Sequence, residues 1–200
     1  MNEIVIEKAR SDDSLEIARL HKNGITKGFL SQQTDDFLSA LYKHLIENEI
    51  VFAARRNDEV VGFVAGTATT SGLFKSFLLK NKSLLIKFAL SNIFARSFVR
   101  KCFETFFAPM RMRSDAGKGL PELLSIVVDK KASGEGIGKE LVNKLDIAFK
   151  NKGILKYKII VGSELEANKF YQNNGFEKIG EVEIHRGALS YIYSKDLKDI

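Results

Sequence analysis

The chain has 200 residues, 44% of them hydrophobic and 28% charged, with a net charge of +6. These values are ordinary for a globular protein, and the length allows one domain with a sizeable core. One cysteine excludes an internal disulfide framework, and with only three scattered histidines no metal cofactor is expected. The sequence has no apolar run long enough to span a bilayer, and its first residues lack the apolar core of a secretory signal, so we expect a cytoplasmic protein.

The first third of the chain predicts a strand, two helices and a hairpin. A short strand around Ile4–Ile6 is followed by a helix that Ser11–Asp13 can cap with their side chains. After the loop Gly24–Gln33, Thr34 can cap a second helix with a regular apolar face. Two runs rich in β-branched residues then flank a polar turn at Arg56–Glu59, which is typical of a hairpin.

The segment from Ser71 to Leu120 concentrates the positive charge of the chain. It holds ten lysines and arginines against two acidic residues, together with eight of the fifteen phenylalanines. We expect a helical insert over about residues 71–116, with the phenylalanines packed on the sheet and the lysines in solvent. Lysines interleaved with aromatic residues also suit an interfacial helix, so peripheral contact with a membrane or another anionic partner is an alternative. No nucleic-acid recognition module is recognisable, and nucleic acid is not expected as a partner.

The remaining chain alternates strands and helices. The predicted elements are a strand at Glu122–Val128, a helix from Ile137 to Phe149, a strand at Tyr157–Val161, a helix at Glu164–Asn173, and two strands around Lys178–His185 and Ala188–Tyr193. The β-branched end of the first of these strands suggests burial on both of its faces. Strands interleaved with helices over the whole chain predict a mixed α/β (α+β) fold.

Three glycines, Gly134, Gly136 and Gly138, separate an apolar strand from an amphipathic helix. The first amides of a helix have no internal partner, and glycines let an anion approach the backbone closely, so we expect the amides of residues 134–139 to bind phosphate. A dinucleotide fingerprint needs a glycine where Lys139 stands, and a Walker A loop needs serine or threonine where Glu140 stands, so both fail. A tight turn without a ligand remains the simpler alternative.

Two motifs, in this order and at this separation, resemble those of the GNAT acyltransferases. Ser133–Gly138 follows the pattern [QR]-x-x-G-x-[GA] after an apolar strand, and Asn168–Phe176, with the sequence NKFYQNNGF, matches their second signature. Ser133 departs from the pattern, because glutamine or arginine is usual there. The resemblance implies one acetyltransferase domain over residues 1–200, with a mostly antiparallel central sheet that is splayed between its middle strands and flanked by helices. It also implies acetyl-CoA as co-substrate and no metal.

The resemblance assigns a role to individual residues. The implied cofactor contacts come from the strand before the glycines, the glycine loop and the last helix: Ile126, Val127, Val128, Ser133, Gly134, Glu135, Gly136, Ile137, Gly138, Lys139 and Asn168. Tyr171 would protonate the departing thiolate. Glu122 is our candidate for the general base, because strand alternation places it on the same face as Leu124 and Ile126. Weaker candidates for the base are three other side chains: Tyr157, Tyr191 and His185.

We expect an N-acetyltransferase that moves an acetyl group from acetyl-CoA to the primary amine of a small molecule, such as an amino sugar or nucleotide-sugar, in a ternary complex. Related enzymes build the acceptor site from the loop between the first two helices, so Phe29 and Leu30 are expected to contact the acceptor. Two other functions stay open: an acyl-CoA-binding regulatory protein on the same scaffold, and an acetyltransferase of protein N-termini or lysines. A homodimer is also compatible with the sequence.

Overall fold

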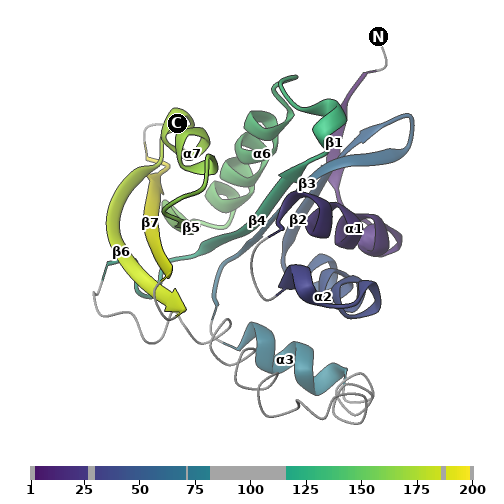
Figure 1. Cartoon of the computed structure of the whole chain (residues 1–200), viewed down its shortest axis with the longest axis horizontal. Helices are drawn as coiled ribbons and strands as arrows, with labels where there is room; N and C mark the ends of the chain where they lie inside the picture. Colours follow the sequence, from purple (N-terminus) through teal and green to yellow (C-terminus); the bar gives the residue numbers. More distant parts are fainter. Residues whose placement is uncertain (1–2, 27–29, 71, 82–115, 186–187, 199–200) are drawn as a thin grey trace. The chain divides into compact units, whose positions relative to one another are not determined.

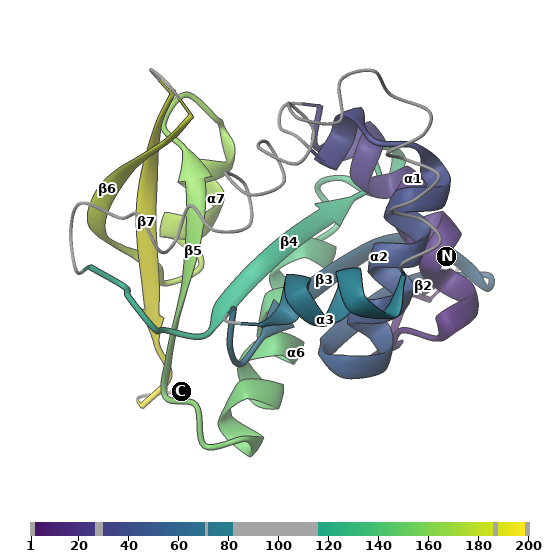
Figure 2. The same ribbon diagram turned by 90° about the horizontal axis from the view of Figure 1, so that it is seen from below.

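A computed structural model describes residues 3–26, 30–70, 72–81, 116–185 and 188–198 (Figures 1 and 2). The helices and strands, in chain order, are β1 (Val5–Lys8), η1 (Ser11–Asp13), α1 (Ser14–Gly24), η2 (Leu30–Gln32), α2 (Asp35–Asn48), β2 (Ile50–Arg56), β3 (Glu59–Thr67), α3 (Leu73–Lys80), β4 (Glu122–Val128), η4 (Lys130–Ala132), α6 (Ile137–Asn151), β5 (Lys156–Gly162), α7 (Ala167–Asn173), β6 (Glu177–His185) and β7 (Ala188–Asp196). This is the predicted order. The helix α3 lies in the segment predicted as a helical insert, and most of the rest of that segment, residues 82–115, lies outside the described residues.

The described strands form a mixed, mostly antiparallel sheet with the order β1-β2-β3-β4-β5-β7-β6. The pairs β1–β2, β2–β3, β5–β7 and β6–β7 are antiparallel, whereas β4 meets β5 in parallel at Glu122 and Lys158. The predicted fold class, a mixed sheet flanked by helices, is therefore confirmed. None of the described helices has a stretch that is both long and apolar enough to span a bilayer.

The chain divides into two compact units, Met1–Ala68 with Leu123–Ile154 and Thr69–Glu122 with Leu155–Ile200. Glu122 and the remainder of β4 thus belong to different units. That residues 1–200 form one domain, and that the sheet is splayed between its middle strands, both stay predictions.

In the first unit, helices pack on both faces of the sheet. Phe63 of β3 meets Tyr42 of α2 edge-on, with 5.1 Å between the ring centroids. The preceding residue, Gly62, faces α6, because a Cβ atom built on Gly62 would lie 3.4 Å from the side chain of Leu141. Because successive residues of a strand point to opposite faces, α2 covers one face of this sheet and α6 covers the other. The missing side chain at Gly66 matters for the same reason, since a Cβ there would lie 2.7 Å from Leu145 of α6.

Local sequence signals explain where the first elements begin. Thr34 caps α2 as predicted, because its hydroxyl accepts a hydrogen bond of 3.3 Å from the amide of Phe37. The hairpin turn also lies where it was predicted, with positive φ angles at Asn57 and Asp58. The predicted cap of α1 is different: Asp13 is buried and its carboxylate pairs with Arg55, so it makes no side-chain capping bond to α1.

The second unit holds a sheet of β5, β7 and β6 together with α7. Its core is aromatic: Phe176 stands edge-on to both Tyr157 and Tyr171, each at 5.4 Å between ring centroids. The ring of Tyr193 on β7 lies 6.4 Å from that of Tyr171. These contacts hold α7 at a fixed position on its sheet, and with it the motif that contains Asn168 and Tyr171.

Candidate active site

The loop between β4 and α6 is built around glycines that need a left-handed backbone. After β4, the amide of Asp129 donates to the carbonyl of Val61 (2.8 Å), and the short helix η4 follows. Gly134 and Gly136 then have φ angles of +85° and +82°, and Gly136 is the N-cap of α6. A residue with a side chain is strained at such angles, so this path requires glycine.

The amides of this loop are available to a ligand. In the described part of the chain, no amide from Gly134 to Lys139 donates a hydrogen bond, and the first bonded amide of the helix is that of Glu140, to the carbonyl of Gly136 (3.1 Å). A Cβ atom built on Gly134 or Gly136 would meet no atom within 4 Å, so the space over the loop is open. Unpaired amides at the positive end of a helix dipole form a site for an anion.

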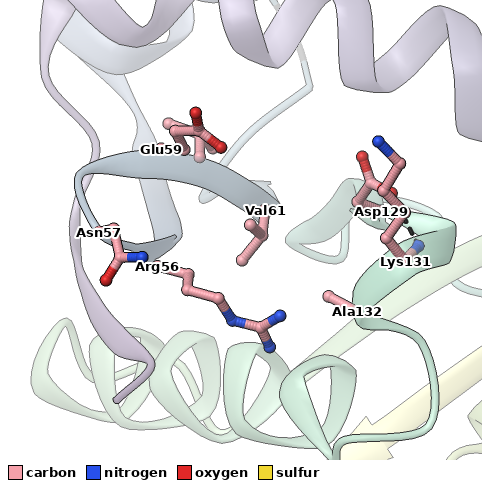
Figure 3. Close-up of a pocket in the computed structure, with 8 residues that line it drawn as sticks. Arg56, Asn57, Glu59, Val61, Asp129, Lys131 and Ala132 are labelled. Atoms are coloured by element: carbon pink, nitrogen blue, oxygen red, sulfur yellow. Dashed lines mark hydrogen bonds between the residues drawn. The ribbon is translucent and has the colours of Figure 1, made fainter. Parts of the chain in front are cut away.

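An arginine from another element reaches this loop. Arg56, at the end of β2, forms an ion pair with Glu135, which stands between Gly134 and Gly136. Beside this pair lies a pocket of about 290 Å³ (Figure 3). Arg56 enters it from the β2–β3 hairpin, and Asp129 and Lys131 line its other side. No local pattern predicts this pairing, because 79 residues separate the two partners.

The strand β4 is buried on one face, which corrects the prediction that both of its faces are buried. Leu123, Ser125 and Val127 are buried, whereas the residues between them are only half-buried. Val127 packs against α1, where a Cβ on Gly24 would lie 2.4 Å from its side chain. The half-buried face carries Ile126, whose main chain is one of the predicted cofactor contacts. Ile126 thus lies on the less buried of the two faces of β4.

A buried hydrogen-bond chain on the other face of β4 was missed by sequence reasoning. The Nδ1 atom of His21 lies 2.6 Å from the hydroxyl of Tyr42, which lies 3.1 Å from the hydroxyl of Ser125. The chain joins α1, α2 and β4. Burial lowers the pKa of His21 to about 4, and its Nε2 atom is buried with no hydrogen-bond partner among the described residues. The available signal was a histidine in register with the apolar residues of the first helix, Ile17 and Leu20.

The buried imidazole of His21 makes the stability of the fold depend on pH. The pKa of His21 is about 4 in the folded protein against 6.5 ordinarily, so the unfolded chain binds the proton more tightly. The contribution of the neutral imidazole is therefore complete above pH 6.5 and is lost as the pH falls towards 4, by on the order of 3 kcal/mol. Urea unfolding at a series of pH values gives the free energy of unfolding as a function of pH. Between pH 4 and 6.5 this free energy should change less steeply with pH for His21→Gln than for the wild type. Equal slopes would contradict the assignment.

In the second unit, Glu122 is paired with a buried lysine. Its Oε2 atom lies 3.6 Å from the Nζ atom of Lys158, and the side chains are 13% and 1% exposed. Burial raises the pKa of Glu122, and the charge of Lys158 opposes this rise. Oε2 has no hydrogen-bond partner in the described part of the chain. Such a carboxylate is suited to accept a proton, and the role of Glu122 as general base stays a prediction.

Tyr171 and Asn168 lie one turn apart on α7. Burial raises the pKa of the Tyr171 phenol, so the group is protonated at neutral pH, and its hydroxyl has no hydrogen-bond partner among the described residues. The side-chain amide of Asn168 donates to the carbonyls of Gly162 (2.9 Å) and Leu165 (2.6 Å), which fixes the loop before α7. Its Oδ1 atom is buried and has no hydrogen-bond partner within the described ranges, and this is the atom left for the predicted contact with a cofactor.

The other predicted residues are placed as follows. Leu30 is half-buried at the start of η2, and Phe29 lies outside the described residues. Tyr157 is buried in the aromatic core, and Tyr191 lies under the ammonium of Lys178 at 3.6 Å, so both rings are used in packing. His185 ends β6. Across the described ranges, no cluster of three or more histidine, cysteine or acidic side chains could hold a metal ion.

The order of the elements and the loop together define a class of protein. An apolar strand, a glycine loop with unpaired amides and a helix are followed by a strand, a short helix with asparagine and tyrosine, and a closing hairpin. This is the arrangement of the GNAT acetyltransferases, and it has the architecture that the sequence motifs implied.

Comparison with known proteins agrees with this assignment of the fold. Residues 108–197 match the family model of the acetyltransferase (GNAT) domain. An N-acetyltransferase from Staphylococcus aureus is 19% identical, with a TM-score of 0.61 over 98% of this chain and 99% of that one. The PaiA N-acetyltransferase from Thermoplasma acidophilum, solved in complex with coenzyme A, is 15% identical, with a TM-score of 0.57 over 97% and 99%. YncA from Salmonella typhimurium, solved with its cofactor acetyl-CoA, is 14% identical, with a TM-score of 0.61 over 100% and 96%.

A comparison with curated protein sequences found no match. The family match over residues 108–197 contains both motifs, and the structural likenesses extend the same fold over nearly the whole length. The chain therefore has the GNAT fold, and its residues 108–197 match the acetyltransferase (GNAT) domain.

Proposed function

We propose that the chain transfers an acetyl group from acetyl-CoA to the primary amine of a small molecule by direct attack in a ternary complex. The observation that carries this proposal is the run of unpaired amides from Gly134 to Lys139 at the start of α6. Coenzyme A has a diphosphate, which is the kind of anion that such amides bind. Two proteins with the same fold were solved with coenzyme A or acetyl-CoA, which supports the choice of donor.

The cofactor contacts follow from the elements that carry them. The diphosphate binds the amides of the glycine loop, and the pantetheine arm binds main-chain groups of Ile126, Val127 and Val128. Ser133 offers only a short hydroxyl where a longer donor is usual in the family. Arg56 brings a cation to the same loop from the β2–β3 hairpin and neutralises the carboxylate of Glu135 beside the diphosphate.

Two side chains of the second unit carry the proton transfers. The neutral amine attacks the thioester carbonyl, and its proton passes to Glu122, directly or through water. A main-chain amide of β4 stabilises the oxyanion while the C–S bond breaks. Tyr171 gives its phenolic proton to the departing sulfur, which leaves as the thiol. The carboxylate of Glu122, paired with Lys158, and the protonated phenol of Tyr171 suit these two opposite roles.

The test is release of free thiol from acetyl-CoA in the presence of amines. The panel should contain amino sugars, nucleotide-linked amino sugars, polyamines, amino acids and peptides with free N-termini or lysines. We expect release with a small amine. Release with peptides alone would replace the small-molecule acceptor by a protein. Binding of acetyl-CoA without release for any amine would favour a regulatory protein, and absence of binding would contradict the proposal.

The acceptor is expected to contact the loop that contains Phe29 and Leu30, and an amino sugar or nucleotide-sugar is the proposed acceptor class. A homodimer, a cytoplasmic location and membrane contact through residues 71–116 stay predictions. The last of these is tested by cosedimentation with anionic vesicles at low salt.

Replacing Arg56 with glutamine is expected to raise the KM for acetyl-CoA by about fivefold, on the order of 1 kcal/mol, with kcat unchanged. The reason is that Glu135 would then face the diphosphate without its partner. Initial rates against acetyl-CoA concentration measure this effect. The double variant Arg56→Gln/Glu135→Gln should return close to the wild-type KM, because it removes the unpaired carboxylate.

Lys144→Gln is the matched control for Arg56→Gln, because Lys144 is an exposed cation on α6 that contributes nothing to the loop. Its KM should equal that of the wild type. A KM for Arg56→Gln that is also unchanged would show that the ion pair has no part in cofactor binding.

A further inference from the structure

Lys158 is a lysine in an unusual place. It lies within β5, and its side chain is only 1% exposed to solvent. Its backbone is fixed on both sides: the amide donates to the carbonyl of Pro121 (2.9 Å), and Ser194 of β7 stands opposite in the antiparallel ladder. A Cβ on Gly117 would lie 3.2 Å from the Cδ atom of Lys158, so the chain passes close over the lysine stem. The ammonium is therefore held in place inside the second unit.

The carboxylate beside Lys158 is that of Glu122. The two residues are register partners across β4 and β5, and their charged atoms lie 3.6 Å apart. This distance is beyond a good hydrogen bond, so the pair gains charge attraction without the short geometry that best offsets desolvation. Burying two charges costs several kcal/mol per ion, and an apolar pair of similar size often serves stability equally well. Stability alone thus gives a poor account of this pair.

The surroundings show what the lysine does to the carboxylate. The recorded neighbours of the Lys158 side chain are Ser194, which stands opposite on β7, and Ile179 and Ile192, which lie against the same glycine. Burial favours the neutral form of Glu122, and the Lys158 ammonium opposes this effect. The carboxylate is thus kept available by one specific neighbour, the ammonium that lies 3.6 Å from its Oε2 atom.

We propose that Lys158 is a positioning residue for the reaction, which holds the buried carboxylate of Glu122 ionised so that this carboxylate can accept the proton of the acceptor amine. This inference rests on the proposed function. The N–H bond of the amine breaks as its nitrogen bonds to the acetyl carbon, and the proton forms a bond to Glu122. Glu122 is then neutral beside Lys158. Release of the proton to solvent restores the pair for the next turnover.

The test is the pH dependence of kcat/KM for the amine in the wild type, Lys158→Met and Lys158→Arg. The acid limb of the profile reports the ionisation of the base. Removing a cation at this distance should move that limb to higher pH by about one unit or more in Lys158→Met, so the loss of activity is largest at low pH. Lys158→Arg keeps the positive charge and should return the limb towards its wild-type position.

The profile separates a positioning role from a merely structural one. A loss of kcat/KM by the same factor at every pH, with the acid limb unmoved, would overturn the proposal. Thermal unfolding should accompany each profile. Where Lys158→Met does not fold, Lys158→Gln takes its place, with the same expected direction of shift. A carbon-13 NMR titration of the Glu122 carboxyl, in the absence of substrates, compares the wild type with Lys158→Met without turnover. An equal titration midpoint of Glu122 in the two proteins would also overturn the proposal.

Glu122→Gln distinguishes this inference from the function on which it rests. If that variant keeps the acid limb of the wild type, Glu122 is not the base, and the role of Lys158 fails with it, although thiol release by the wild type would still support acetyl transfer. If Glu122→Gln loses the limb but Lys158→Met does not shift it, only the role of Lys158 fails.

Discussion

Tyr171→Phe should lower kcat by about 10²- to 10⁴-fold, the usual contribution of a general acid, and leave the KM for acetyl-CoA nearly unchanged. The substitution removes one hydroxyl from a ring whose packing the structure shows in detail. Phe170 and Phe176 stand edge-on to the ring at 5.3 and 5.4 Å between centroids, and a phenylalanine can keep both contacts. The expected loss is therefore of proton transfer rather than of binding or stability.

The state of the phenol supports this size of effect. Burial raises the pKa of Tyr171, so the proton that the thiolate needs is present throughout the neutral range. No described residue hydrogen-bonds the hydroxyl, so no competing acceptor in the described part of the chain holds that proton. The same burial destabilises a thiolate without a proton, which makes the donor more important than it would be in water.

The matched control is Tyr193→Phe. Tyr193 is a buried tyrosine of the same aromatic core, 6.4 Å from Tyr171 between centroids, and the mechanism gives its hydroxyl no part. Thiol-release assays of both variants should find kcat lowered in Tyr171→Phe and close to the wild type in Tyr193→Phe. Equal turnover of Tyr171→Phe and the wild type would remove this residue from the mechanism.

The parts of the fold that the sequence predicted depend on short-range rules. Thr34 caps α2 because a hydroxyl before a helix can reach an amide within the first turn. The glycine loop was predictable because φ angles above +80° at Gly134 and Gly136 can be adopted without strain only by glycine. In both cases the partners are separated by a few residues, so the pattern of the sequence contains the contact.

The parts that could not be predicted are contacts between distant residues. Tyr42 and Ser125 are 83 residues apart, and nothing in either local pattern says that the hydroxyls meet. Alternation placed Glu122 on the correct face of its strand, but the pairing with Lys158 depends on the register of β4 against β5. The over-prediction of burial on β4 has a related cause. Valine and isoleucine favour strands by their shape, and they do so whether one face of the strand is covered or both.

Gly136→Val should weaken the binding of coenzyme A by about 10²-fold or more. Gly136 is the N-cap of α6 with a φ angle of +82°, where a β-branched residue is strained by about 1–2 kcal/mol or more. Relief of that strain turns the loop amides away from their present directions. A side chain at this position would also project into open space over the loop, where we propose that the diphosphate binds. Loss of two hydrogen bonds to a charged group, each of about 1.5–3 kcal/mol, accounts for the expected change.

Gly153→Val separates this effect from strain alone. Gly153 follows the other end of α6, with a φ angle of +73° and no atom within 4 Å of a Cβ, so the substitution has a similar backbone cost far along the helix from the loop. Urea unfolding should show a comparable loss of stability in the two variants, whereas calorimetric titration with coenzyme A should show weakened binding only in Gly136→Val. Wild-type affinity in a folded Gly136→Val protein would mean that the cofactor does not use this loop, and the proposed function would fail with it.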